Sequence, residues 1–308
     1  MVNQQAHQQD LAGRPFDTRE PVHRRHGLPS HQPWRRMALC VDDFGLHSGI
    51  NEAVLVLAGM GRVQAVSVMV GGAAWHDGAR ALHAIDTARL EVGLHLDLTE
   101  CPLNPALRKP LSRLIGLAYL RRLDAVALHA EIAAQLDAFE CAMGRAPAYV
   151  DGHQHVHQLP MVRSILLHEL TRRYPKEMLW VRATNGPSRT AHSDAPQGFK
   201  SRMIPLLGAH ALAVLARKQG VSQNAHLLGV YDFSGGPARY RTLLADWLRA
   251  AQDGDLLMCH AGMRADVTDV IGGARQNEFD VLVSPEFGVA LVAAQVRLVP
   301  MGQIVGRA

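Results

Sequence analysis

The amino-acid sequence predicts an α/β fold of the (β/α)-barrel type, complete or distorted, and three observations support this prediction. From Met37 onward, short apolar runs alternate with longer segments of helical periodicity. Seven or eight such units suit a closed or nearly closed barrel better than a small open sheet. Polar residues capable of chemistry follow the ends of several runs, and active sites of (β/α) barrels lie at the carboxyl ends of the strands.

The predicted strands are short apolar runs, and Glu91–Thr99 shows the pattern most clearly. In this run Val92, Leu94, Leu96 and Leu98 share one face of the strand, as alternation with period two requires. Helices of crossover length separate the runs, which implies parallel pairing. The predicted strands are Met37–Val41, Ala65–Val70, Glu91–Thr99, Ala148–Val150, Leu179–Ala183, Leu227–Phe233, Asp255–Cys259 and Val296–Val299.

The predicted helices lie between these strands. The first begins at Ser48, the predicted N-cap, and carries an apolar stripe over residues 50–58. A long helix ends before Gly144, a residue typical of the position after a helix. The later helices are Leu123–Met143, Met161–Arg173, a stretch around Met203–Arg217, Ala238–Gln252 and Pro285–Ala294.

Residues 1–36 differ in composition from the rest of the chain. They have almost no apolar residues and no periodicity, which predicts a disordered basic N-terminal tail or an upstream extension of the reading frame. Six arginines and three acids give this tail a net charge of +3, so that residues 37–308 carry only about +1 of the total of +4. We therefore expect a single barrel domain over 37–308 and no nucleic-acid partner.

Other features of the composition limit the class of protein. The longest candidate for a membrane span, Leu206–Ala216, is too short and contains His210, so no transmembrane segment is expected. The four cysteines form no C-x-x-C pair, which favours reduced thiols and a cytoplasmic location. The tail makes only a weak case for contact with an anionic membrane. The oligomeric state is left open, a homodimer included.

Chemically capable side chains lie at or just beyond the carboxyl ends of five of the predicted strands. Because these strands come from distant parts of the chain, their coincidence at strand ends favours a functional site over five separate polar loops. They are Asp42 and Asp43 in "VDDFG", His95 and Asp97 in "VGLHLDLTE", His153, His155 and His157 in "VDGHQHVH", Arg182 in "LWVR" and His260 in "LMCHAG".

The residue types indicate a metal centre. One carboxylate with two imidazoles leaves coordination positions open for water and substrate. If "DGHQHVH" is extended, alternation places His153, His155 and His157 on a common face, where one or two bind the metal and another contacts substrate or supports a ligand. Spacing does not decide between them. The sequence has no H-E-x-x-H, Walker A or G-x-S-x-G motif.

The motifs "VDDFGLHSGIN", "VGLHLDLTE", "VDGHQHVHQLP" and "LMCHAG", in this order, resemble those of the YdjC-like carbohydrate deacetylases. That family includes chitooligosaccharide deacetylases and deacetylases associated with hopanoid biosynthesis. The resemblance implies that Asp43, His95 and His153 hold a divalent metal ion, Mg²⁺ or Zn²⁺. It also implies that Asp42 is the catalytic carboxylate and His260 the acid.

The chain departs from the commonest family wording at three positions, none of them an implied metal ligand. Val41 stands where Ala is frequent, Gly152 where Ser is frequent and Ala261 where Pro is frequent. The residue at 152 leaves the particular substrate open. The expected function is metal-dependent removal of an acetyl group from an N-acetylated sugar, an N-acetylglucosamine-type oligosaccharide or a glycolipid. A metal-dependent phosphoesterase and a catalytically silent sugar-binding protein are the alternatives.

Three further residues have two interpretations each. Arg182 orients Asp42 or binds a sugar hydroxyl. Trp75 stacks on a sugar ring or packs in the core. Asp97 supports a ligand histidine through its second ring nitrogen or faces water.

Overall fold

The structure is a computed structural model, and it describes residues 33–175, 179–187, 204–264 and 269–306. The predicted tail therefore lies outside the described residues up to position 32, and so does Met203 at the start of one predicted helix. The described residues contain eight strands: β1 (Arg35–Phe44), β2 (Ala65–Val68), β3 (Glu91–Leu96), β4 (Tyr149–Gly152), β5 (Trp180–Val181), β6 (Leu227–Leu228), β7 (Asp255–Cys259) and β8 (Val296–Leu298).

All strand pairs among the described residues are parallel, in the order β5-β4-β3-β2-β1-β7-β6, and β8 pairs with the first residues of β1. The two ends of this order approach each other without a regular ladder. An isolated bridge joins Trp180 to Ser222, and the Leu227 N–H donates to the Asn185 carbonyl at 2.8 Å. The prediction of a distorted (β/α) barrel is thus confirmed.

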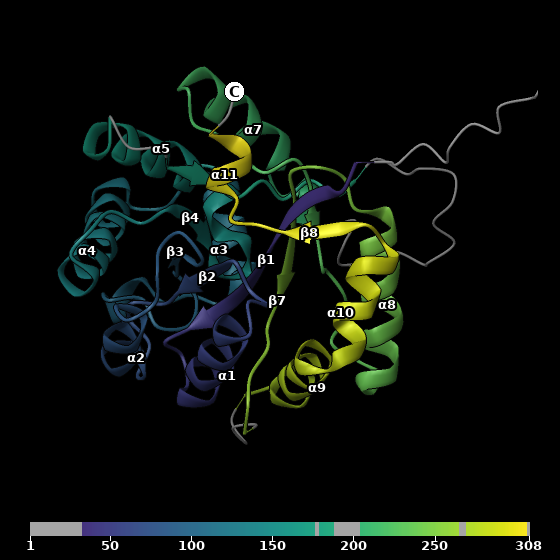
Figure 1. Ribbon diagram of the computed structural model, residues 1–308. Coiled ribbons are helices and arrows are strands. Elements are labelled where there is room, and N and C mark those ends of the chain that lie inside the picture. The colour runs from purple at the N-terminus through teal and green to yellow at the C-terminus, as the bar shows by residue number, and fades with distance from the viewer. Residues whose placement is uncertain (1–32, 176–178, 188–203, 265–268, 307–308) are drawn as a thin grey trace, which may run out of the picture. The chain divides into compact units, whose positions relative to one another are not determined.

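Helices surround the sheet, and Figure 1 shows α2, α4 and α5 toward the left of the view, α8 and α10 toward the right, and α1 and α9 below β1. The helices are α1 (Ser48–Gly59), α2 (Trp75–Leu82), α3 (Leu111–Tyr119), α4 (Ala125–Met143), α5 (Val162–Arg173), α7 (Ala209–Lys218), α8 (Gly236–Ala250), α9 (Gly272–Val283), α10 (Pro285–Ala293) and α11 (Gly302–Val305). The described residues also contain two 3₁₀ turns, η1 (Pro105–Leu107) and η2 (His153–Gln158). None of the described helices has the length and apolar character that crossing a membrane requires.

Most predicted elements are present, with shifted ends. Gly144 ends α4 in a left-handed conformation at φ 65°, and Asp255–Cys259 is a strand over the predicted residues. The cap of α1 differs from the prediction, because Ser48 is the first helical residue and His47 holds the cap position. The third strand stops at Leu96, since the Asp97 carboxylate accepts hydrogen bonds from the next turn and ends the extended run.

The strand β1 starts at Arg35, two residues inside the predicted tail. Arg35 and Arg36 pair with β8, and the Arg35 guanidinium donates to the Ala251 carbonyl at 2.6 Å. The Arg36 guanidinium forms an ion pair with Asp253 at 2.6 Å. Backbone pairing and these contacts outweigh the polar composition that suggested disorder.

The two faces of the sheet carry separate apolar clusters. The larger cluster joins outward strand residues to the helices, and the smaller one consists almost entirely of strand residues. The smaller cluster therefore fills the barrel interior. It contains Ala38, Cys40, Ala65, Tyr149, Trp180, Leu227, Leu256, Met258 and Met301.

The interior rows change from apolar to polar toward the carboxyl ends of the strands. Asp42, Asp151, Arg182 and His260 each stand two positions after a member of the interior cluster, on the same face of the chain. A Cβ on Gly93 would lie 2.5 Å from the Tyr149 ring, so only glycine lets the ring cross β3. Apolar side chains therefore fill the barrel near the amino ends of the strands, and polar side chains form a layer at their carboxyl ends.

Candidate active site

Adjacent acids on a regular strand point to opposite faces, but Asp42 and Asp43 both line one pocket of about 770 Å³. The backbone explains how this is possible. Asp43 has φ 70°, and the register between β1 and β2 shifts between Val41 and Phe44, which turns the second carboxylate back toward the interior. A left-handed conformation at a non-glycine residue costs of order 1–3 kcal/mol and is typical of functional sites.

Asp43, His95 and His153 form the group that the resemblance implies as metal ligands. One candidate ligand atom from each lies within 4.8 Å of the others. The Asp43 Oδ1 atom is 2.9 Å from His153 Nδ1 and 3.3 Å from His95 Nε2. Two of the three side chains are fully buried, and His153 reaches the pocket surface.

The surroundings of His95 suit a metal ligand. Its Nδ1 atom lies 2.6 Å from Asp151 Oδ1 and carries a proton toward it, so that Nε2 is the nitrogen that faces Asp43. Burial alone would lower the pKa of His95, but the charges of Asp151 and Asp42 outweigh it and raise the pKa to about 10. The charges of Asp151 and Asp42 would equally favour a metal cation at Nε2 in place of a proton on that nitrogen. The donor set of one carboxylate and two imidazoles thus fits a divalent metal ion.

Arg182 holds Asp42 in a two-point ion pair. Its Nη1 and Nη2 atoms donate to the two Asp42 oxygens at 2.6 and 2.7 Å, and Nη2 lies 2.5 Å from Asp151. Burial would raise the pKa of Asp42, but the Arg182 charge and hydrogen bonds outweigh burial and lower it below its ordinary value. Arg182 is fully buried and lies outside the pocket lining. Its contacts favour the first of its two interpretations, the orientation of Asp42.

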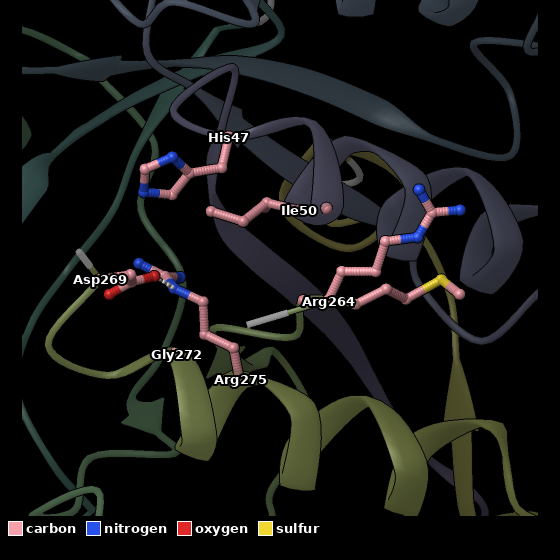
Figure 2. A pocket seen from close by; sticks show the side chains of 9 residues that line it. His47, Ile50, Arg264, Asp269, Gly272 and Arg275 are labelled. Atoms are coloured by element: carbon pink, nitrogen blue, oxygen red, sulfur yellow. Dashed lines mark hydrogen bonds and ion pairs between the residues drawn. The ribbon is translucent and has the colours of Figure 1, made fainter. Parts of the chain in front are cut away.

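Arg275, on α9, contacts the second carboxylate oxygen of Asp43. Its Nη2 atom lies 2.7 Å from Asp43 Oδ2, and its Nε atom donates to Asp269 at 2.6 Å. Burial would raise the pKa of Asp43, but Arg275 and His153 outweigh it and lower the pKa well below its ordinary range. Figure 2 shows Arg275 and Asp269 pointing toward each other, with His47 across a cavity of about 10 Å³, room for one water molecule.

His260 lines the same pocket and follows β7, the strand that pairs with β1 beside Asp42 and Asp43. Its backbone N–H donates to Glu278 at 2.5 Å, and its ring meets the edge of Phe233. The Nδ1 atom is buried without a hydrogen-bond partner among the described residues, which leaves it available to a bound molecule. Burial lowers the pKa of His260 to about 4 and raises the pKa of Glu278 to about 7.

The histidine run adopts a different conformation from the extended one considered above. Residues 153–158 form a 3₁₀ turn in which Gln154 and His155 have positive φ values of 52° and 61°. The three side chains therefore separate. His155 lines the pocket next to His153, whereas His157 is fully buried and its Nε2 atom lies 3.0 Å from the Arg182 carbonyl. Burial lowers the pKa of both histidines.

Trp75 and Asp97 do not reach the pocket. Trp75 packs in the core against Phe139, with 6.3 Å between ring centroids, which favours the core interpretation over stacking on a sugar. The rings that do line the pocket belong to Tyr231 and Phe233. Asp97 does not face water, since it is buried and accepts from the backbone of residues 99–101. Burial would raise the pKa of Asp97, but the charge of His153 and these hydrogen bonds outweigh burial and lower it.

Three residues near the site were absent from the sequence prediction. Asp151 holds His95 and Arg182, and its position at a strand end in "YVDGH" was a signal that could have found it. Arg275 and Glu278 lie on α9, a segment without a clear apolar stripe, and nothing in their local sequence marks them as buried. Only packing reveals these two residues.

The fold and the site define an α/β protein of the distorted (β/α)-barrel type with a carboxylate–histidine cluster at the carboxyl ends of its strands. The model of the YdjC-like protein family matches residues 36–293, most of the chain. The chain therefore belongs to the YdjC-like family, which confirms the resemblance of its motifs.

Curated relatives of this chain carry deacetylase names. The chain is similar to a carbohydrate deacetylase of Homo sapiens, 36% identical over 155 residues, which are 45% of this chain and 46% of the relative. It is also similar to a chitooligosaccharide deacetylase of Salmonella dublin, 29% identical over 147 residues, 44% of this chain and 55% of the relative. The chain spans about half the length of the curated relatives it matches.

Solved structures share the fold at low identity. A protein of Enterococcus faecalis V583, provisionally named for cellobiose-phosphate cleavage, matches with a TM-score of 0.64 and 18% identity over 88% of this chain and 99% of its own. An uncharacterized protein of Agrobacterium tumefaciens C58 matches with a TM-score of 0.51 and 11% identity over 90% and 91%. At these identities the likeness shows the fold alone.

Proposed function

We propose that this protein is a metal-dependent carbohydrate N-deacetylase that hydrolyses the acetamide of an N-acetylated sugar. The family and the names of the curated relatives support the reaction. The observation that carries the proposal is the division between the two adjacent acids. Asp43 faces two imidazoles, whereas Asp42 is held by Arg182, and both border the same pocket as His260.

Asp43, His95 and His153 would hold the metal ion, Mg²⁺ or Zn²⁺. A cation bound there supplies Lewis acidity, which makes water more acidic and stabilises negative charge on the acetamide oxygen. Asp151 keeps the His95 ring in the tautomer that such binding requires. Arg275 binds Oδ2 of Asp43, so that Oδ1 is the oxygen that faces the two histidines.

Asp42 is the proposed general base. It is ionised because Arg182 lowers its pKa, and the two-point contact fixes the direction of its oxygens. It takes a proton from the attacking water, and His260 delivers a proton to the leaving amine. Since burial lowers the pKa of His260 to about 4, the ring is neutral at pH 7; it takes up a proton from solvent as negative charge develops beside it and passes that proton to the leaving amine. Asp42 returns the proton of the attacking water to solvent at the end of the reaction.

The walls of the pocket suit a sugar. The charged residues lie at the carboxyl ends of the strands, and the apolar lining includes Leu46, Leu111, Leu207, Tyr231 and Phe233. Aromatic and aliphatic side chains cover the apolar faces of sugar rings. The same walls would accept an apolar aglycone, so an oligosaccharide and a glycolipid both fit the lining.

Mass spectrometry of candidate substrates tests this function. Purified protein with Mg²⁺ or Zn²⁺ is incubated with N-acetylated oligosaccharides, with acetylglucosaminyl lipids and with generic phosphate esters. We expect the loss of one acetyl group from one of the first two classes and no phosphate release. Asp42→Asn should lower turnover by a factor of roughly 10²–10⁴ and still bind metal. An active Asp42→Asn variant, or cleavage of phosphate esters alone, would contradict the proposal.

A further inference from the structure

The segment between Cys101 and Leu123 is strongly basic. It contains five basic residues and no acid, although residues 37–308 as a whole carry a net charge of only about +1. The small total therefore conceals a local excess of positive charge beside α3. The five residues are Arg108, Lys109, Arg113, Arg121 and Arg122.

Most of this charge faces outward without a carboxylate partner. Arg113, Arg121 and Arg122 are exposed, and none of them forms an ion pair within the ranges that the structure describes. Arg108 approaches Glu100 only to 3.7 Å, and both side chains are about half exposed. Unpaired guanidinium groups at a surface remain available to an anionic partner.

Exposed apolar side chains accompany these arginines. Leu114 and Ala118 turn inward from α3, which directs Arg113 and the residue at its end, Leu120, outward. Leu120 is 65% exposed and Leu206 is 72% exposed. The Tyr119 hydroxyl donates to the Leu206 carbonyl at 3.4 Å, so the two segments are neighbours. We call this surface the α3 face: Arg113, Tyr119, Leu120, Arg121, Arg122 and Leu206.

The α3 face borders the mouth of the catalytic pocket. Leu111, the first residue of α3, lines the pocket, and so do Ile204 and Leu207 on either side of Leu206. The apolar lining thus continues from the pocket onto the exposed surface.

We propose that the α3 face docks on an anionic lipid bilayer, with the mouth of the pocket directed toward the headgroups. Arginines beside exposed leucine and tyrosine side chains are what interfacial binding requires, because the charges attract anionic headgroups and the apolar groups enter the headgroup boundary. A nucleic acid would pair with the arginines but would leave Leu120 and Leu206 without an apolar partner. This inference does not depend on the deacetylase reaction, since bilayer binding is measured without substrate.

Co-sedimentation of the full chain with vesicles tests the proposal. One set of vesicles contains phosphatidylcholine and phosphatidylglycerol in equal parts, and the other contains phosphatidylcholine alone. We expect binding to the anionic vesicles that weakens as salt is raised. Arg121→Glu/Arg122→Glu should weaken this binding by about tenfold or more, and Leu120→Ser/Leu206→Ser should weaken it at every salt concentration.

The matched control is Arg89→Glu/Arg297→Glu. Both residues are exposed arginines near the amino ends of β3 and β8, at the opposite end of the barrel from the pocket, and the variant should bind as the wild type does. All variants keep the basic residues of 1–36, so a difference between them reports the α3 face. Unfolding in urea establishes that each variant is folded.

Three outcomes would overturn the proposal. The wild type could ignore anionic vesicles at low salt, or both arginine pairs could lose binding equally. Tight binding to single-stranded RNA that Leu120→Ser/Leu206→Ser leaves unchanged, without vesicle binding, would instead identify a nucleic-acid surface.

Discussion

Asp42 and Asp43 at the end of β1, and Glu278 on α9, are all buried carboxylic acids on the borders of one site, yet their ionisation differs. The pKa values of Asp42 and Asp43 lie below the ordinary value, and that of Glu278 is raised to about 7. Burial is the largest influence in all three cases. The difference is the ion pair, because Arg182 and Arg275 each hold one of the β1 acids.

The pKa values of His95 and His260 depend on the same balance between burial and nearby charge. For a histidine, burial lowers the pKa and a neighbouring carboxylate raises it. His95 lies among Asp43 and Asp151, and its pKa is raised to about 10, whereas burial lowers the pKa of His260 to about 4. Burial therefore neutralises a group where no opposite charge outweighs it and leaves it charged where one does. The pocket has a charged side suited to a metal ion and a base, and a neutral side suited to proton delivery.

The largest expected effect comes from removing the charge that balances burial. Arg182→Met leaves Asp42 and Asp151 buried without their shared cation, so we expect the free energy of unfolding to fall by about 3–5 kcal/mol. Urea unfolding at pH 7 measures this loss. Arg239→Met is the control, since its ion pair with Asp232 is half exposed and should contribute less than about 1 kcal/mol. If both variants lost less than about 1 kcal/mol in free energy of unfolding, Arg182 would not be needed to balance the buried charges of Asp42 and Asp151.

A second change acts on the proposed metal site through Asp151, the acid that contacts His95. Asp151→Asn removes the carboxylate that fixes the His95 tautomer, and metal affinity should fall by roughly 10–100-fold. Calorimetric titration of Mg²⁺ and Zn²⁺ without substrate measures the affinity. Asp255→Asn alters a buried acid that contacts the Nδ1 atom of another histidine, His226, at the amino end of β7, and should leave the affinity unchanged. Wild-type affinity in Asp151→Asn would remove Asp151 from the metal site.

The smallest expected effect concerns the protonation of Glu278, whose side chain is neutral in the fold below a pH of about 7. Between the ordinary glutamate pKa of 4.5 and the value of about 7 in the fold, folded Glu278 keeps a proton that the unfolded chain has lost. Its stabilising contribution is therefore full below pH 4.5 and is lost as the pH rises through 7. Glu278→Gln lacks this dependence, and relative to the wild type it should gain about 2 kcal/mol between pH 5 and pH 7.

Urea unfolding of both proteins at the two pH values measures this gain. Glu52→Gln, which changes an acid at the surface, serves as the control and should follow the wild type. A constant difference between Glu278→Gln and the wild type would mean that Glu278 is ionised in the fold.

Several features of the fold were predictable because they depend on neighbouring residues. The apolar runs predicted the strands, and the single glycine at 144 predicted the end of α4. Trp75–Leu82, Leu111–Tyr119 and Gly272–Val283 were absent from the prediction as helices. In α9 the packing of neighbours on several sides, instead of an apolar stripe, stabilises the helix, and a periodicity search does not detect such a pattern.

The sequence by itself determined the alternation of strands and helices, the family, and the strand ends at which chemistry was expected. These follow from local periodicity and from short motifs, which a chain carries whether or not it is folded. Only the tertiary structure decided that Asp43 turns back beside Asp42, that the histidine run separates, and that α9 supplies Arg275 and Glu278. Those outcomes depend on which distant groups share a buried space, because charge and ionisation there are set by the neighbours across the barrel.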